Sequence, residues 1–319
     1  MNRLIVVILA CALSSELLAQ DYPAKPVRIV VPFAAGGAAD ISARGVTPGL
    51  TETLRQNVIV DNRPGAGGTI GAEFVAKALP DGYTLLLGSN STLSVAPSLY
   101  PRIRYNPVRD FSPITLVATT PMVLAIHPSV PAKNVKEFIA IAKAKPRILT
   151  MASGGLGSMN QMTGELFQSL TGVKFNHVPF KGSAPAVVGL ISGEVDMIFD
   201  QLATSVALIN AGKLRALGVT ARTRNQLLPQ VPTMTEAGVA DYQVTSITGL
   251  LLPAGTSGDI VSRLNTAIIN VLKNDDVKAR LATVGLEVQG STPQEFRTFI
   301  KDDLERWTKV VKTANISVE

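Results

Sequence analysis

The stretch Val27–Asp40, with the sequence VRIVVPFAAGGAAD, joins a short β-branched apolar run to a small-residue turn and then to a longer apolar segment. Residues 27–31 predict a buried strand, and residues 38–54 carry apolar side chains at helical spacing. Gly36 and Gly37 suit the tight connection between the two, because glycine adopts backbone conformations that other residues avoid. A strand, a glycine turn and a helix in this order begin a βαβ unit.

The same alternation continues along the chain. Apolar patterns predict further strands at residues 58–60, 84–87, 148–152, 173–178 and 195–199, and helices at residues 71–79, 135–145, 159–170 and 184–192. Apolar strands with crossover helices on both faces are typical of parallel sheets. The sequence therefore predicts an α/β fold of mainly parallel sheets flanked by helices.

Two long apolar passages divide this pattern into two units. Residues 114–126 separate the units, residues 244–252 lead out of the second one, and helices at 260–273, 277–284 and 293–313 should return to the first. We expect two lobes joined by two crossover strands, with lobe I at residues 20–121 and 250–319 and lobe II at residues 122–249. Two such crossings form a hinge about which rigid lobes can rotate.

The first residues have the layout of a secretory signal peptide. A basic start at Arg3 precedes the apolar run 4–13 and a more polar exit, so we expect a signal peptide at residues 1–19 with cleavage after Ala19. An apolar run of about ten residues is too short to span a bilayer. The sequence ILAC that ends at Cys11 faintly resembles a lipoprotein cleavage box, so lipidation of Cys11 remains an alternative.

Composition excludes several kinds of chemistry. The only cysteine is Cys11, so the exported chain would contain no disulfide, thiolate metal site or cysteine nucleophile. The 30 Lys and Arg residues exceed the 24 Asp and Glu residues, which gives a formal charge of +6 and favours anionic ligands. No nucleic acid partner is expected, because the basic residues are scattered and aromatic residues make up only 5% of the chain.

Two glycine-rich loops, each placed after a strand and before a helix, are the main candidate for a ligand site. The first is residues 33–40 and the second residues 153–160, and helix N-termini of this kind attract anions through unpaired N–H groups. Ordinary tight turns are the alternative for both loops. In the first loop the acidic side chain should bond to loop amides rather than touch an anion. The candidate residues are Phe33, Ala34, Ala35, Gly36, Gly37 and Asp40 in the first loop, and Ser153, Gly154, Gly155, Gly157 and Ser158 in the second.

Polar residues at two other strand ends join this candidate site, since ligands bind at the carboxyl ends of strands in open α/β sheets. Ser89, Asn90 and Ser91 follow the third strand, where a surface turn is the alternative. Asp200 follows the apolar run 195–199, where capping of the next helix is the alternative.

No catalytic, cofactor or metal signature is present in the sequence. It has no phosphate loop and no nucleophile elbow, and Ile70 occupies the place of the last glycine in the dinucleotide-binding pattern. His127 and His177 stand alone after apolar strands, which is more typical of structural residues than of a base or a metal ligand. We therefore expect no enzymatic activity, no cofactor and no metal.

A set of ordered motifs gives a resemblance to a known family. The motifs are PAKPVRIVVPF at residues 23–33, GG and Asp40 at residues 36–40, DNRPGAGG at residues 61–68, PDGYTL at residues 80–85, PFKG at residues 179–182, AGKLRAL at residues 211–217, PQVPT at residues 229–233 and LPAG at residues 252–255. Together they resemble the Bug family of extracytoplasmic receptors, over residues 22–316.

The resemblance implies a type II periplasmic-binding-protein-like fold and a periplasmic receptor of a tripartite tricarboxylate transporter. It implies a small carboxylate ligand held by the two loops, with Asp200 helping to select the rest of the ligand, and delivery to an integral membrane permease of a large and a small subunit. The chain departs from the common family pattern at Gln161, Phe180 and residues 247–248. We expect a monomer. A ligand receptor for a sensor kinase is the alternative function.

Overall fold

The computed structural model describes residues 22–100, 102–313 and 316. The predicted signal peptide at residues 1–19, its cleavage after Ala19 and the possible lipidation of Cys11 lie outside the described residues. Among the helices of the described chain, none is both long enough and apolar enough to cross a membrane.

The elements follow the predicted alternation closely. Lobe I contains β1 (Val27–Val31), α2 (Ala38–Leu54), β2 (Val58–Asn62), the 3-10 turn η1 (Ala66–Gly68), α3 (Thr69–Ala76), β3 (Thr84–Ser89), the π-helical turn η2 (Ser91–Val95), α4 (Ala96–Leu99), α9 (Gly258–Lys273), α10 (Asp275–Ala282), β10 (Glu287–Val288) and α11 (Pro293–Thr313). Lobe II contains α5 (Val135–Ala144), β5 (Thr150–Ser153), α6 (Met159–Thr171), β6 (Asn176–Pro179), α7 (Ser183–Ser192), β7 (Met197–Gln201), α8 (Leu202–Asn210) and β8 (Arg215–Val219).

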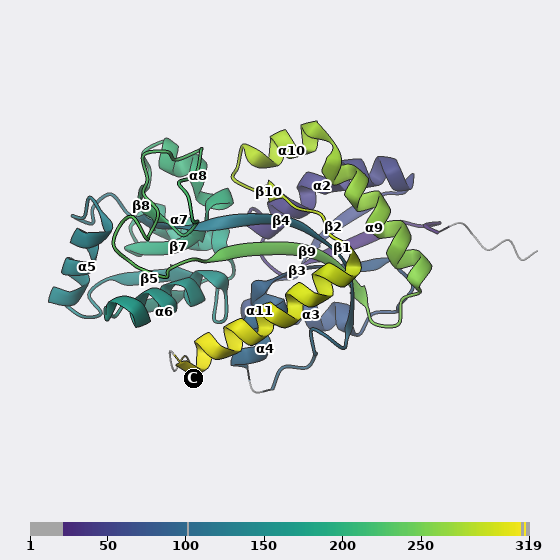
Figure 1. Cartoon of the computed structure of the whole chain (residues 1–319), viewed down its shortest axis with the longest axis horizontal. Coiled ribbons are helices and arrows are strands. Elements are labelled where there is room, and N and C mark those ends of the chain that lie inside the picture. The colour runs from purple at the N-terminus through teal and green to yellow at the C-terminus, as the bar shows by residue number, and fades with distance from the viewer. Residues whose placement is uncertain (1–21, 101, 314–315, 317–319) are drawn as a thin grey trace, which may run out of the picture.

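Two long strands, β4 (Phe111–Ile126) and β9 (Thr245–Pro253), run side by side from one lobe to the other (Figure 1). These are the predicted crossover strands. β4 pairs with β9 as far as Pro121 and from Met122 onward pairs with β7 and β8. Because proline has no N–H group to donate, this change of partner falls where the strand is weakly bonded and can bend. The lobe boundaries at 121/122 and 249/250 stay a prediction.

The sheets are mixed, because the predicted parallel strands of each lobe are joined by antiparallel crossover strands. β1 is parallel to β2 and β3, and β5 is parallel to β6 and β7, as the βαβ pattern requires. β9 is antiparallel to β3 and β4, and β4 is antiparallel to β7, β8 and β10. The reason is that the chain leaves lobe I along β4 and returns along β9, so the two crossovers must run in opposite directions.

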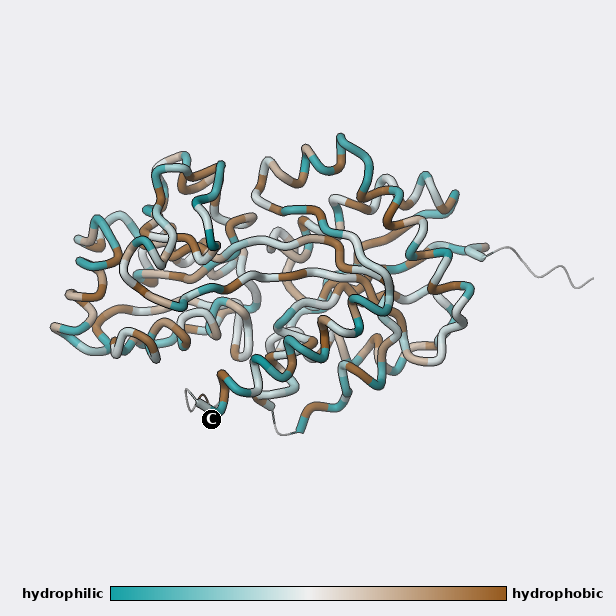
Figure 2. Tube along the Cα trace, in the orientation of Figure 1, coloured by the Kyte–Doolittle hydropathy of each residue, from teal (hydrophilic) through white to brown (hydrophobic). Residues whose placement is uncertain are grey.

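Apolar helix faces close the core of each lobe. In α2 the buried side chains include Ala43, Val46, Leu50 and Leu54, which recur at helical spacing and pack with β1. A Cβ atom at Gly49 would lie 2.9 Å from a Val271 methyl carbon, so glycine lets α9 approach α2 closely. Helix α11 also has one apolar face, and Figure 2 shows hydrophilic and hydrophobic residues alternating along it.

Candidate functional site

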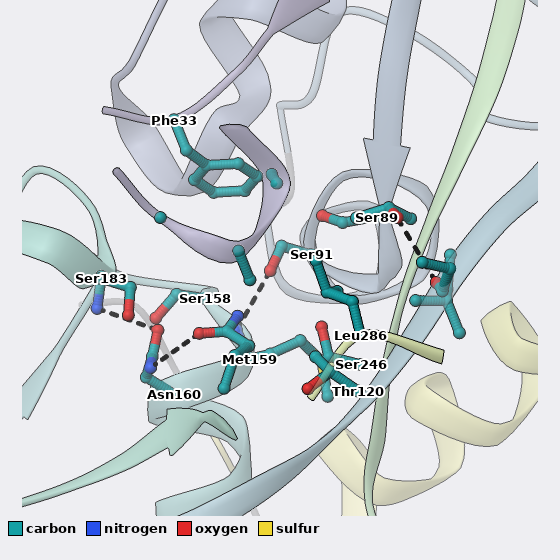
Figure 3. Close-up of a pocket in the computed structure, with 18 residues that line it drawn as sticks. Phe33, Ser89, Ser91, Thr120, Ser158, Met159, Asn160, Ser183, Ser246 and Leu286 are labelled. Atoms are coloured by element: carbon teal, nitrogen blue, oxygen red, sulfur yellow. Dashed lines mark hydrogen bonds between the residues drawn. The ribbon is translucent and has the colours of Figure 1, made fainter. Parts of the chain in front are cut away.

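A pocket lies between the lobes, beside the two crossover strands. The residues that line it border about 540 Å³ of empty space, a volume that includes open solvent, and none of these described residues is charged. The two loops singled out in the sequence face each other across the pocket (Figure 3). The predicted residues on its wall are Phe33, Gly37, Ser89, Ser91, Gly154 and Ser158.

The first loop leaves the start of α2 open. Gly37 is the N-cap and provides no side-chain bond to the first-turn N–H groups of the helix. Such groups have no partner inside the helix, and together with the helix dipole they attract negative charge. An anion in the pocket can therefore accept hydrogen bonds at this point.

Asp40 serves the loop rather than the pocket, as expected from its charge. Its carboxylate accepts the Gly36 N–H at 3.0 Å, the Arg44 Nε–H at 3.0 Å and an Asn62 side-chain N–H at 3.0 Å. Burial raises the pKa of Asp40, but these donors outweigh burial and hold the pKa below its usual value. Asp40, Ala34, Ala35 and Gly36 do not line the pocket, although they shape the loop that does.

The second loop is largely satisfied by the protein itself. Ser158 caps α6 by accepting the Gln161 N–H at 3.4 Å, and Gln161 Oε1 accepts the Gly157 N–H at 2.7 Å. The Met159 N–H donates to Ser91 Oγ of lobe I at 3.1 Å, as Figure 3 shows. The two loops therefore differ, because Ser158 caps the helix start of the second loop, whereas Gly37 provides no side-chain cap in the first.

Ser153 lies behind the second loop and does not line the pocket. Its fully buried hydroxyl is 2.6 Å from His177 Nε2 and also accepts the Gly155 N–H at 3.1 Å. Burial lowers the pKa of His177, which favours a neutral ring. Gly155 and Gly157 have φ angles of +116° and +73°, which other residues rarely adopt, so both glycines fix the loop shape.

The polar run after β3 is buried rather than a surface turn. Ser89 Oγ has no hydrogen-bond partner, although the side chain is only 6% exposed and lines the pocket. Asn90 turns away, because its amide donates to Asp303 at 2.9 Å and its oxygen accepts the Ile247 N–H at 2.8 Å. A buried hydroxyl without a partner is rare in proteins, so Ser89 is a candidate ligand donor.

Asp200 is fully buried behind the pocket wall. It accepts hydrogen bonds from Ser183, Ser205 and, at 3.0 Å, from Asn160. Burial raises the pKa of Asp200 to about 6, although these bonds favour the charged form. Ser183 and Asn160 line the pocket whereas Asp200 does not, so Asp200 holds two wall residues in place. The N-cap of α8 is Gln201, which makes no side-chain cap bond.

Much of the pocket wall comes from residues that the sequence did not single out. β4 contributes Ala118 and Thr120, and β9 contributes residues 246–248. In an apolar strand such residues carry no motif, and only the pairing of β4 with β9 brings them together. The one sequence signal for these wall residues is at residues 247–248, where the chain departs from the common family pattern.

Within the described residues, no group of three His, Cys, Asp or Glu side chains is arranged to hold a metal ion.

Comparison with known proteins identifies the family. A family model described as a tripartite tricarboxylate transporter family receptor, TctC, matches residues 42–316. The solved periplasmic binding protein BugD is 35% identical with a TM-score of 0.90, and the match covers 93% of this chain and 99% of that chain.

Two further solved structures carry ligands. An R. palustris protein with adipate is 37% identical with a TM-score of 0.90, covering 93% of this chain and 99% of that one. MatC from Rhodopseudomonas palustris with bound malate is 36% identical with a TM-score of 0.88, covering 91% and 100%.

These matches confirm the resemblance and the α/β periplasmic-binding-protein fold. They also confirm the expectation of a binding protein rather than an enzyme. The chain therefore belongs to the tripartite tricarboxylate transporter receptor family, a periplasmic family of solute-binding receptors.

Proposed function

We propose that the protein captures a small carboxylate in the pocket between its lobes and delivers it to a membrane permease of a large and a small subunit. Export by the leader at residues 1–19 would place it in the periplasm, where we expect it to act as a monomer. The observation that carries the proposal is the open start of α2 in a pocket whose lining residues bear no charge.

The chemistry of the wall fits a carboxylate. The first-turn N–H groups of α2 can donate to one carboxylate oxygen, and the unpartnered Ser89 hydroxyl can donate as well. Ser91 accepts from the Met159 N–H, so its own hydroxyl hydrogen remains free for the ligand. Hydrogen bonds to a charged acceptor are stronger than those between neutral groups, so a few such donors can hold an anion without a cation.

Relatives with known ligands support this class. Adipate and malate are both small dicarboxylates, and each is bound by a protein that shares more than a third of its residues with this chain. The pocket of this chain also has Asn160, Ser183 and Gln201 on the lobe II side. The Gln201 side-chain amide can donate to the end of the ligand that lies away from α2, whereas Asn160 and Ser183 already donate to Asp200 and offer acceptor atoms there.

Calorimetry of the purified protein tests the proposal. Titration with malate, adipate and citrate should show saturable binding of at least one acid, whereas succinamide, which lacks a charged oxygen, should not bind. Binding of neutral amides and of no carboxylate would overturn the proposal. Mass spectrometry of compounds that co-purify with the exported protein would then name the natural ligand.

A further inference from the structure

The lobes also touch each other at a place outside the pocket lining. Tyr100, directly after α4 in lobe I, donates from its hydroxyl to the Leu156 backbone oxygen of lobe II at 2.8 Å. Tyr100 does not line the pocket. This bond is therefore independent of any contact with the ligand.

The second loop is shaped to receive the tyrosine ring. A Cβ atom at Gly157 would lie 3.2 Å from Tyr100 Cε2, a distance tighter than ordinary contacts, so glycine permits the ring to lie against the loop. The φ angle of Gly157 is +73°, which also favours glycine. The close approach of Tyr100 and the positive φ angle are thus two separate reasons for glycine at this position.

An apolar cluster surrounds this contact. Leu99, next to Tyr100, packs in one buried cluster with Met159 and Met162 of lobe II and with Trp307 of α11. Rotation of the lobes about β4 and β9 would separate Leu99 from Met159 and break the Tyr100–Leu156 bond. The Tyr100–Leu156 bond and the contacts of Leu99 with Met159 and Met162 therefore depend on closed lobes.

We propose that Tyr100 is a closure latch, a positioning residue that raises ligand affinity by stabilising the closed lobes without touching the ligand. Affinity for a ligand that binds the closed state is reduced by the fraction of protein that is open. One hydrogen bond present only in the closed state shifts the closed-to-open ratio by roughly threefold to tenfold. The inference rests on the receptor function proposed above, but its test needs no ligand.

The test compares lobe separation in ligand-free protein. The only cysteine of the chain lies in the predicted leader, so nitroxide labels can be placed at Glu52→Cys on α2 and Lys143→Cys on α5, both exposed. Pulsed electron resonance gives the distribution of distances between the two labels. Tyr100→Phe removes the hydroxyl but keeps the ring, so it should move population from the shorter to the longer distance by the same threefold to tenfold factor.

Tyr83→Phe is the matched control. The Tyr83 hydroxyl accepts the Ala24 N–H at 2.9 Å entirely within lobe I, so its loss should leave the distances unchanged. An unchanged distribution in Tyr100→Phe, or an equal shift in Tyr83→Phe, would overturn the latch. Failure of malate or adipate to bind would count against the proposed ligand class and leave this result standing.

Discussion

Ser91 of lobe I accepts a hydrogen bond from the backbone N–H of Met159 at the first turn of α6 in lobe II, with an N–O distance of 3.1 Å. A side chain of one lobe thus occupies the helix start of the other. The helix N-terminus polarises the Ser91 hydroxyl, which makes it a better donor to an anion in the pocket. Ser91 therefore takes part both in a contact between the lobes and in the lining of the proposed ligand pocket.

Ser91→Ala should weaken carboxylate binding by about tenfold, because it removes both a bond between the lobes and a donor to the ligand. Calorimetry against malate or adipate, whichever binds, measures the change. Ser98→Ala is the control, since the Ser98 hydroxyl bonds to Ser94 and Thr308 away from the pocket. Equal affinities for Ser91→Ala and Ser98→Ala would show that Ser91 is not a ligand contact.

Gly37→Asp should abolish carboxylate binding while keeping the fold. A Cβ atom at Gly37 meets its nearest neighbour at 3.6 Å and the φ angle is −79°, so a side chain fits. The new carboxylate would cap α2, occupy the open N–H groups and repel an anionic ligand. We expect affinity to fall by about a hundredfold, an effect of about 3 kcal/mol.

Gly37→Ala separates the effect of an added side chain from the effect of an added carboxylate at the same position. It adds the Cβ atom without an acceptor, so its affinity should stay near that of the unchanged protein. Urea unfolding should show Gly37→Asp to be at least as stable as Gly37→Ala, because only the aspartate caps the helix. Carboxylate binding that survives in Gly37→Asp would place the ligand elsewhere.

The double variant Ser153→Ala with Ser158→Ala should lose both affinity and stability. Loss of the Ser158 cap costs about 1 kcal/mol, and loss of the buried Ser153–His177 bond costs about another 1 kcal/mol. Urea unfolding measures the stability, and calorimetry measures the affinity. The single variant Ser158→Thr keeps a capping hydroxyl, so it should retain most of the stability that the Ser158 cap contributes. Full affinity in the double variant would remove Ser158 from the proposed site and show that Ser153 does not shape it.

Asp200→Asn should change how stability depends on pH. The pKa of Asp200 is about 6 in the folded protein because of burial, and the ordinary value is 3.8, so the folded state binds a proton more tightly than the unfolded chain does. The Asp200 contribution to the free energy of unfolding is therefore greatest below pH 4 and is lost as pH rises through about 6. The span is of the order of 3 kcal/mol.

Urea unfolding at pH 4.5, 6 and 7.5 measures this dependence in both proteins. The difference in free energy of unfolding between the unchanged protein and Asp200→Asn should shift in favour of the unchanged protein as the pH falls. The other titrating groups are common to both proteins, so they do not contribute to this difference. A constant difference across this range would mean that Asp200 titrates near its ordinary value in the folded protein.

Local sequence determined the elements and the family. The bounds of β1 and α2 follow from β-branched and apolar periodicity together with the glycine turn between them, because these are short-range steric and burial effects. The ordered motifs from residue 23 to residue 255 predicted the receptor family, and the family match confirmed it. The two glycine loops were also found this way, because a strand end and a helix start are both visible in the chain.

Tertiary structure alone decided how these parts are used. The sequence gives no sign that Ser89 lacks a partner, that Asp200 stands behind Ser183 and Asn160, or that the Met159 N–H is taken by Ser91. Nor does it give the antiparallel direction of β9, which brings residues 246–248 into the pocket. Each of these depends on atoms that are distant in the chain, so only the packing of two lobes around two crossing strands could settle which donors stay open for a ligand.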